Sequence, residues 1–425
     1  MVVRQHAWCR ILFVTALLAP SSPISAAENW PQWRGPLAGG VAAEGDYPVE
    51  FSSDKNVAWK LALPGVGCST PVVWDDLIFV TCSIDGEDGV VCCDFNGNER
   101  WRRQLGPERA GKHRNGSGSN PSPVTDGKHL VAYFKSGTVA GLTTDGRELW
   151  RVNLQDKYGP DSLWWDIGSS PALAEDRAIV AVMQAGNSYL VALDLETGDV
   201  LWKVPREYQC PRESDQAYAS PQIVQLDGRS VLVTLGSDHL TGHDVETGEM
   251  LWECGGFNPD EQGMWRVIAS AVIDGDIAFV PYGRGECLAG IRLGGSGDVT
   301  TTNRLWEKAG HKLGTEVPTP VVQDGRVYLL GDSGRVACFD IRSGEELWSS
   351  DLPRSRQRYF SSPLLAGDQL YCPREDGTIF VGRVSDSGFE LLAENEMGEP
   401  TIAAPVPIND GLLIRGREHL FRIEK

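Results

Sequence analysis

Three repeated patterns in the 425-residue sequence predict an all-β protein, an eight-bladed β-propeller with four-stranded antiparallel blades. The first pattern is a hairpin that recurs at residues 191–203, 242–252 and 338–348, with looser copies at 140–150 and 92–101. The second is a small residue followed by Pro, and the third is a single Trp late in each repeat. The spacing of these two markers, roughly 42 to 54 residues, is typical of one propeller blade.

The hairpin at residues 191–203 reads as a strand, a tight polar turn and a second strand. Val191 and Trp202 suit a pleated, half-buried surface, and Thr197-Gly198 supplies the turn. The Trp falls on the outermost strand, where we expect it to cover the gap to the neighbouring blade. We expect the position of Ala192 to be crowded, because the residues that we align with it are all small: Ala140, Gly242, Cys92 and Cys338.

The other two markers give the number of blades. The small residue before Pro is found at Thr70, Ser122, Ser170, Ser220, Thr319, Ser362 and Ala404, and Ser270-Ala271 fills the fifth place without Pro. The Trp is found at Trp59, Trp101, Trp150, Trp202, Trp252, Trp306 and Trp348, and is missing near Leu391. Both markers therefore predict eight blades.

The two ends of the chain predict how the ring closes. The first strand, at 56–61, is a lone strand of the Trp-bearing type, and the chain ends with three strands and no fourth. We expect the N-terminal strand to complete the last blade, because an open ring would expose strand edges that invite aggregation. Residues 54–425 would then form one propeller.

Two segments precede the propeller. Residues 1–27 have a basic start, a short apolar run and small residues before a cleavage point at Ala27, the features of a secretory signal peptide. We therefore expect an extracytoplasmic protein, periplasmic or secreted, that does not span the membrane after cleavage. Residues 28–53 are rich in Pro and Gly, which predicts an irregular arm. We expect Trp30 and Trp33 to pack this arm against the propeller.

Charge and cysteine content exclude some kinds of partner. The net charge of −19 argues against a nucleic-acid binder, which usually has a basic surface. Of ten Cys, nine remain after Cys9 is removed with the signal peptide, so at least one thiol lacks an intramolecular partner. Paired Cys-x-x-Cys motifs are absent, which argues against a zinc site.

The loops between blades are the candidate functional region. These loops are long and differ from one another, whereas the turns on the opposite face are short and repetitive. Each between-blade loop leads into an innermost strand beside the central channel. Arg and His there could hold an anion, aromatic rings could stack on a ligand, and Asp could bind a cation or act as a base. The alternative is that these are solvated loop residues and aromatics that fill the channel mouth. The candidates are His113, Arg114, Asn115, Trp164, Trp165, Asp166, Asp215, Tyr218, Arg266, Arg356 and Tyr359.

The Ala-x-Asp-x-x-Thr-Gly-x-x-x-Trp pattern resembles the tryptophan-docking repeat of the pyrroloquinoline quinone (PQQ)-type propellers, over residues 57–425. That family includes quinoprotein alcohol dehydrogenases, which use PQQ and calcium, and cofactor-free relatives such as the outer-membrane assembly lipoproteins of the BamB type. The fold alone does not choose among these functions.

The cofactors that this resemblance implies have weak support in the residues. Quinoprotein dehydrogenases carry a disulfide between adjacent Cys, but Cys92 and Cys93 fall in a predicted strand, where successive side chains point to opposite faces. The sequence has no dense acidic run of the calcium-loop type, and the family's calcium ligands and catalytic acid match no specific residues here. PQQ and Ca²⁺ are therefore expected from resemblance only.

Together these observations favour a binding or scaffold protein over an enzyme. Its ligand, a protein, a glycan or a small molecule, would bind the face formed by the between-blade loops. No catalytic residue and no metal ligand is assigned. The first alternative is a PQQ-dependent sugar or alcohol dehydrogenase. The second is a BamB-like envelope assembly factor, against which the lack of a well-placed lipid-attachment Cys counts.

Overall fold

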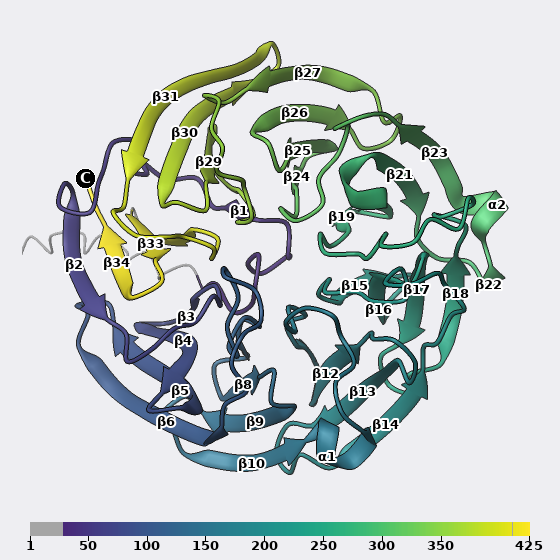
Figure 1. Ribbon diagram of the computed structural model, residues 1–425, viewed down its shortest axis with the longest axis horizontal. Helices are drawn as coiled ribbons and strands as arrows, with labels where there is room; N and C mark the ends of the chain where they lie inside the picture. The colour runs from purple at the N-terminus through teal and green to yellow at the C-terminus, as the bar shows by residue number, and fades with distance from the viewer. Residues whose placement is uncertain (1–28, 410) are drawn as a thin grey trace, which may run out of the picture.

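The computed structural model describes residues 29–409 and 411–425, which form eight antiparallel sheets around a central channel (Figure 1). This confirms the predicted eight-bladed β-propeller. The predicted signal peptide lies outside the described residues. Within the described part of the chain, no helix has the length and apolar character needed to cross a membrane.

Each blade runs from an innermost strand at the channel to an outermost strand at the rim. The first four blades are β3–β6 (Val72–Trp74, Leu77–Ile84, Glu87–Asp94, Glu99–Pro107), β7–β10 (Val124–Thr125, His129–Tyr133, Thr138–Thr143, Glu148–Asn153), β11–β14 (Ala172–Ala174, Arg177–Val182, Tyr189–Asp194, Val200–Pro205) and β15–β18 (Gln222–Leu226, Arg229–Gly236, His239–Asp244, Met250–Cys254). The next three are β19–β21 with β23 (Val272–Asp274, Ile277–Tyr282, Cys287–Arg292, Arg304–Ala309), β24–β27 (Val321–Gln323, Arg326–Leu330, Arg335–Asp340, Glu346–Asp351) and β28–β31 (Leu364–Ala366, Gln369–Pro373, Thr378–Ser385, Gly388–Glu396).

The eighth blade joins the two ends of the chain. Its inner strands are β32–β34 (Val406–Ile408, Gly411–Arg415, His419–Ile423), and its outermost strand is β2 (Val57–Ala62), which pairs antiparallel with β34. Figure 1 shows purple β2 beside yellow β34. The N-terminal strand therefore closes the ring, as the sequence predicts.

A few short elements lie between the strands of the ring. Helix α1 (Leu154–Tyr158) follows the second blade, and the turn η1 (Gly283–Gly285) joins β20 to β21. The fifth blade carries an insertion with β22 (Gly297–Asp298) and α2 (Thr300–Asn303), and β22 pairs with the outer edge of β18.

The outer tryptophans join neighbouring blades. Six indole N–H groups each donate to a backbone carbonyl in the hairpin of the next blade at 2.8–3.0 Å, from Trp59, Trp101, Trp150, Trp202, Trp306 and Trp348. For all of these except Trp348, the turn glycine of that next hairpin packs against the indole ring. A Cβ on Gly198, for example, would lie 2.7 Å from the Trp150 ring, and Gly198 has a φ of +73°, a conformation that suits Gly. One contact thus explains both the Trp and the Thr-Gly of the repeat.

Two places depart from this pattern. Trp252 is buried, but its indole N–H has no partner among the described residues. At the place where a docking carbonyl is expected, after Leu293, the chain turns away into the β22–α2 insertion. In the seventh blade, which lacks the Trp, the Phe389 ring packs against Gly382 instead.

The crowded position opposite the Trp is also present. Ala192, Gly242, Cys92 and Cys338 each lie opposite the Trp of their own blade. In the second blade the residue opposite Trp150 is Gly141, not the predicted Ala140, because the turn of this hairpin is one residue shorter than that of the hairpin at 191–203.

The N-terminal arm crosses the channel on the face of the Thr-Gly hairpins. It contacts innermost strands on both sides of the channel: Trp30 bridges to Val73, and β1 (Val41–Ala42) pairs with β28. The buried Arg34 donates to the carbonyls of Pro320 and Pro363. The arm is thus anchored to blades that lie far from it in the sequence.

Candidate functional site

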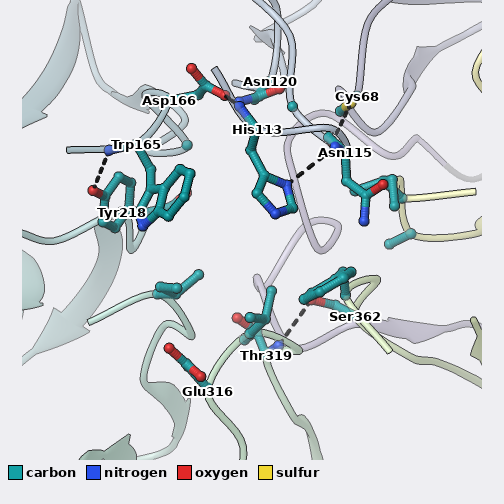
Figure 2. Close-up of a pocket in the computed structure, with 18 of the residues that line it drawn as sticks. Cys68, His113, Asn115, Asn120, Trp165, Asp166, Tyr218, Glu316, Thr319 and Ser362 are labelled. Carbon is teal, nitrogen blue, oxygen red and sulfur yellow. Dashed lines mark hydrogen bonds between the residues drawn. The ribbon is translucent and has the colours of Figure 1, made fainter. Parts of the chain in front are cut away.

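A pocket of about 400 Å³ occupies the centre of the ring on the face of the between-blade loops (Figure 2). We call this face the loop face and this cavity the central pocket. Its wall comes from the residues that lead into the innermost strands, and its rim comes from the loops between blades. A cavity of this size is within the range that binds small ligands.

The wall of the central pocket is built on a ring of hydroxyl groups, which we call the hydroxyl ring. At each of six blade junctions the backbone N–H of one ring residue donates to the side-chain oxygen of the next, at 2.9–3.0 Å. The order around the ring is Thr70, Ser122, Ser170, Ser220, Ser270, Thr319 and Ser362. Ala404 N–H then donates to Thr70 Oγ1 at 3.2 Å, and only the step from Ser362 to Ala404 lacks a hydroxyl acceptor. The small residue before Pro therefore links neighbouring blades by hydrogen bonds at the channel.

The arm closes the other end of the central pocket. Trp33 lines the pocket, whereas its neighbours Asn29 and Trp30 bond to the Asp75 turn and to Val73, on the opposite face. The channel is therefore a pocket open toward the loop face and floored by an indole. The sequence predicted that both Trp30 and Trp33 pack the arm onto the body, but only Trp30 is fully buried.

His113 reaches into the central pocket between Trp165 and Asn115 (Figure 2). Its Nδ1 accepts the Asn115 N–H at 3.1 Å, so in the neutral imidazole the proton lies on Nε2. The rings of Trp165 and Phe360 meet the imidazole edge to face, with centroids 5.3 and 6.1 Å away. His113 is thus a positioned donor in an aromatic setting.

The acidic groups of the pocket are already engaged by the protein. Asp166 is buried and forms an ion pair with the buried Lys135, with Nζ 2.5 Å from Oδ1, and it accepts the N–H groups of Lys112 and His113. Asp332 accepts the N–H of Glu316 at 2.7 Å, and burial raises the pKa of its carboxyl above the usual value.

Arginines hold the remaining acids. Arg266 lies between Glu213 and Glu316, at 2.8 and 3.0 Å, and Arg284 contacts Glu316 from the other side at 3.2 Å. Arg358 also lines the pocket, and within residues 29–409 and 411–425 no carboxylate lies close enough to its guanidinium to form a salt bridge, although its charge acts on Asp332. Arg358 therefore places a positive charge at the rim of the pocket.

The structure brings together six of the residues singled out from the sequence. These six line the central pocket: His113, Asn115, Trp165, Asp166, Tyr218 and Arg266. The hydroxyl of Tyr218 accepts the Trp165 N–H at 3.1 Å, and burial raises the pKa of this phenol.

The other five lie outside the central pocket. Arg114 forms an ion pair with buried Glu375 at 2.9 Å, Trp164 is exposed beneath the guanidinium of Arg212, and Arg356 is exposed. Asp215 has a buried oxygen without a partner among the described residues, and burial raises the pKa of its carboxyl. Tyr359 is buried between the sixth and seventh blades.

Several contributors to the pocket are absent from the candidates chosen from the sequence, among them Trp33, Arg284 and the hydroxyl ring. Trp33 belongs to the arm, and only its contacts with distant blades place it at the channel. Arg284 comes from a turn within a blade. The hydroxyl ring has a signal in the sequence, because most of the small residues before Pro are Ser or Thr, but the sequence analysis used that position only to count the blades.

The comparisons with known proteins agree with this architecture. The family model described as outer membrane protein assembly factor BamB matches residues 38–203 and 135–387, which is most of the chain. The chain belongs to the BamB family. BamB of Salmonella typhimurium is 27% identical over 390 residues, covering 84% of this chain and 86% of the relative. BamB of Escherichia coli is 25% identical over 390 residues, covering 86% and 89%.

Solved structures of two kinds share the fold. BamB from Moraxella catarrhalis superposes with a TM-score of 0.59 at 15% identity, covering 87% of this chain and 97% of that chain. Quinohemoprotein alcohol dehydrogenase from Comamonas testosteroni superposes with a TM-score of 0.68 at 13% identity, covering 93% and 80%. At these identities the likeness shows the fold alone.

The residues of this BamB-family chain do not fit a PQQ and calcium site. Cys92 and Cys93 are buried in two different clusters on opposite faces of their sheet, away from the central pocket. All nine cysteines in the described residues are free thiols. No group of three or more His, Cys, Asp or Glu suited to a metal ion occurs in that part of the chain, and the pocket acids are held by Lys135, arginines and backbone N–H groups.

Proposed function

We propose that this chain is an extracytoplasmic scaffold that binds a protein partner at its loop face, around the central pocket. The observation that carries the proposal is the pocket itself. It opens on the face where the loops differ from blade to blade, and it is closed by Trp33 on the face where the turns repeat. Diverse loops on a rigid repeat are a common way to build a binding surface.

Two further features support a protein as the partner. The relatives that match most of the chain carry the name outer membrane protein assembly factor. The loop face also exposes side chains typical of protein interfaces beside the pocket, with Trp164 at 52% and Met264 at 43% exposure. The Met264 N–H donates to the Arg212 carbonyl, so two loops present this surface together. The features of residues 1–27 support export.

Site-specific photo-crosslinking in the cells that make the protein tests the proposal. A photoreactive residue at Trp164 or Arg356, both exposed on the loop face, should form adducts of discrete mass with an envelope protein. The matched control is Leu201, 42% exposed on the outer strand β14, which should form none of them. The same adducts from all three positions, or none from the loop face, would contradict the proposal.

A further inference from the structure

The unused hydrogen-bonding capacity of the central pocket is made of donors. Six members of the hydroxyl ring line the pocket and are at least nine-tenths buried: Thr70, Ser122, Ser170, Ser220, Thr319 and Ser362. Each of these hydroxyl oxygens already accepts a backbone N–H from the neighbouring blade. Each therefore retains a proton to donate.

These protons have no acceptor in the part of the protein that the structure describes. Among the described residues, none of the six hydroxyls donates a hydrogen bond to another protein atom. A buried donor without an acceptor is unfavourable, so an atom inside the pocket must accept these protons. The ring thus presents its donors to whatever occupies the channel.

The upper part of the pocket adds donors and offers few acceptors. The neutral imidazole of His113 carries its proton on Nε2, because Nδ1 accepts the Asn115 N–H, and the Arg358 guanidinium forms no salt bridge in the described part of the chain, although its charge acts on Asp332. The acids Asp166, Glu316 and Asp332 are occupied by Lys135, by arginines and by backbone N–H groups. The pocket therefore has a surplus of donors from base to rim.

We propose that the central pocket is a binding site for a carboxylate group. A carboxylate is acceptor-only, and its two oxygens can accept from adjacent hydroxyls in short, charge-assisted hydrogen bonds. The net charge of −19 would repel an anion at longer range, but this repulsion is screened beyond about 8 Å in physiological salt. The hydrogen-bond donors of the pocket act on the carboxylate in direct contact. The inference rests on the proposed function in one respect, that the loop face is the binding face. The carboxylate would be borne by the partner or by a small acid.

Calorimetric titration of the mature chain tests the ligand class. In one arm the probes are tricarballylate and its neutral triamide, and in the other they are hexaglutamate and hexaglutamine. At least one acid should bind about tenfold or more tightly than its neutral counterpart. A tighter tricarballylate would indicate a small acid, and a tighter hexaglutamate would indicate a partner segment. If neither acid binds more tightly than its amide, the proposal is wrong.

The hydroxyl ring supplies its own matched control. Ser220→Ala and Ser270→Ala each remove one inter-blade acceptor, but Ser220 lines the pocket and Ser270, fully buried, does not. Ala404 shows that the ring accommodates Ala at one position. Both variants should lose similar stability, while only Ser220→Ala should weaken the acid by about tenfold or more. Equal weakening by the two variants would overturn the proposal.

The two proposals can fail separately. If no acid binds but the loop-face adducts persist, the carboxylate inference is wrong and the scaffold remains. If an acid binds and the adducts are absent, the carboxylate inference stands and the proposed protein partner at the loop face is wrong.

Discussion

Replacing a docking tryptophan with phenylalanine should measure what its inter-blade hydrogen bond contributes to stability. The ring provides an internal comparison. Trp202 donates to the Val245 carbonyl at 2.9 Å, whereas the Trp252 indole N–H has no partner among the described residues. Both side chains are buried, at 8% and 1% exposure, and both pack in the same core cluster. The two variants therefore lose similar apolar contact but differ in hydrogen bonding.

The expected difference follows from the polar groups that each variant leaves behind. Trp202→Phe leaves the buried Val245 carbonyl without its donor, which costs about 1–3 kcal/mol beyond the lost packing. Trp252→Phe instead discards a buried donor that had no acceptor, so its polar contribution is favourable. We expect Trp202→Phe to be the less stable variant by at least about 1 kcal/mol, even though Trp252 is the more buried side chain.

Urea unfolding followed by far-UV circular dichroism checks this expectation, because the signal does not depend on the removed indole. If the two variants share the same slope with denaturant, the difference in midpoint reports the difference in free energy of unfolding. An unfolding free energy for Trp252→Phe equal to or below that of Trp202→Phe would refute the reasoning. Packing alone would then account for the recurrence of the docking contact from blade to blade.

Three further outcomes are expected. Gly198→Ala should lower the unfolding free energy by more than Gly228→Ala. Both glycines have a positive φ, which costs about 1–2 kcal/mol for Ala, but only the Cβ added at Gly198 would meet an indole ring. Equal losses of stability in the two variants would argue against this packing. Deleting residues 54–63 should convert the protein to aggregates on size-exclusion chromatography, because β34 loses its partner β2; a monomer with a cooperative melt would contradict this closure. Burial raises the pKa of Asp88 to about 7, so the folded state keeps a proton that the unfolded state releases near pH 4. The unfolding free energy should therefore fall by as much as roughly 4 kcal/mol as the pH rises from 4 to 7. Asp88→Asn should remove this part of the pH dependence of unfolding, and an unchanged slope would show that Asp88 is not its source.

The features that could be predicted from the sequence are those that each repeat carries within itself. Thr197-Gly198 and Trp202 are a few residues apart, so one hairpin displays both its turn and its docking side chain. Because the blades repeat one pattern, recurrence gives the number of blades, and an incomplete last repeat predicts that the strand at 56–61 closes the ring. The order of strands also assigns the variable loops to one face. Periodic local patterns therefore determined the fold and the face that holds the candidate site.

The composition of the pocket depended on contacts between residues far apart in the chain. Trp33 lines it because Arg34 reaches the carbonyls of Pro320 and Pro363, contacts that no local pattern records. Tyr359, only one residue before Phe360 of the pocket, points into the core between two blades instead. The order of strands in the sequence by itself determined which loops meet at the channel. Residues within these loops follow no period, so only tertiary packing decided which of their side chains enter the pocket.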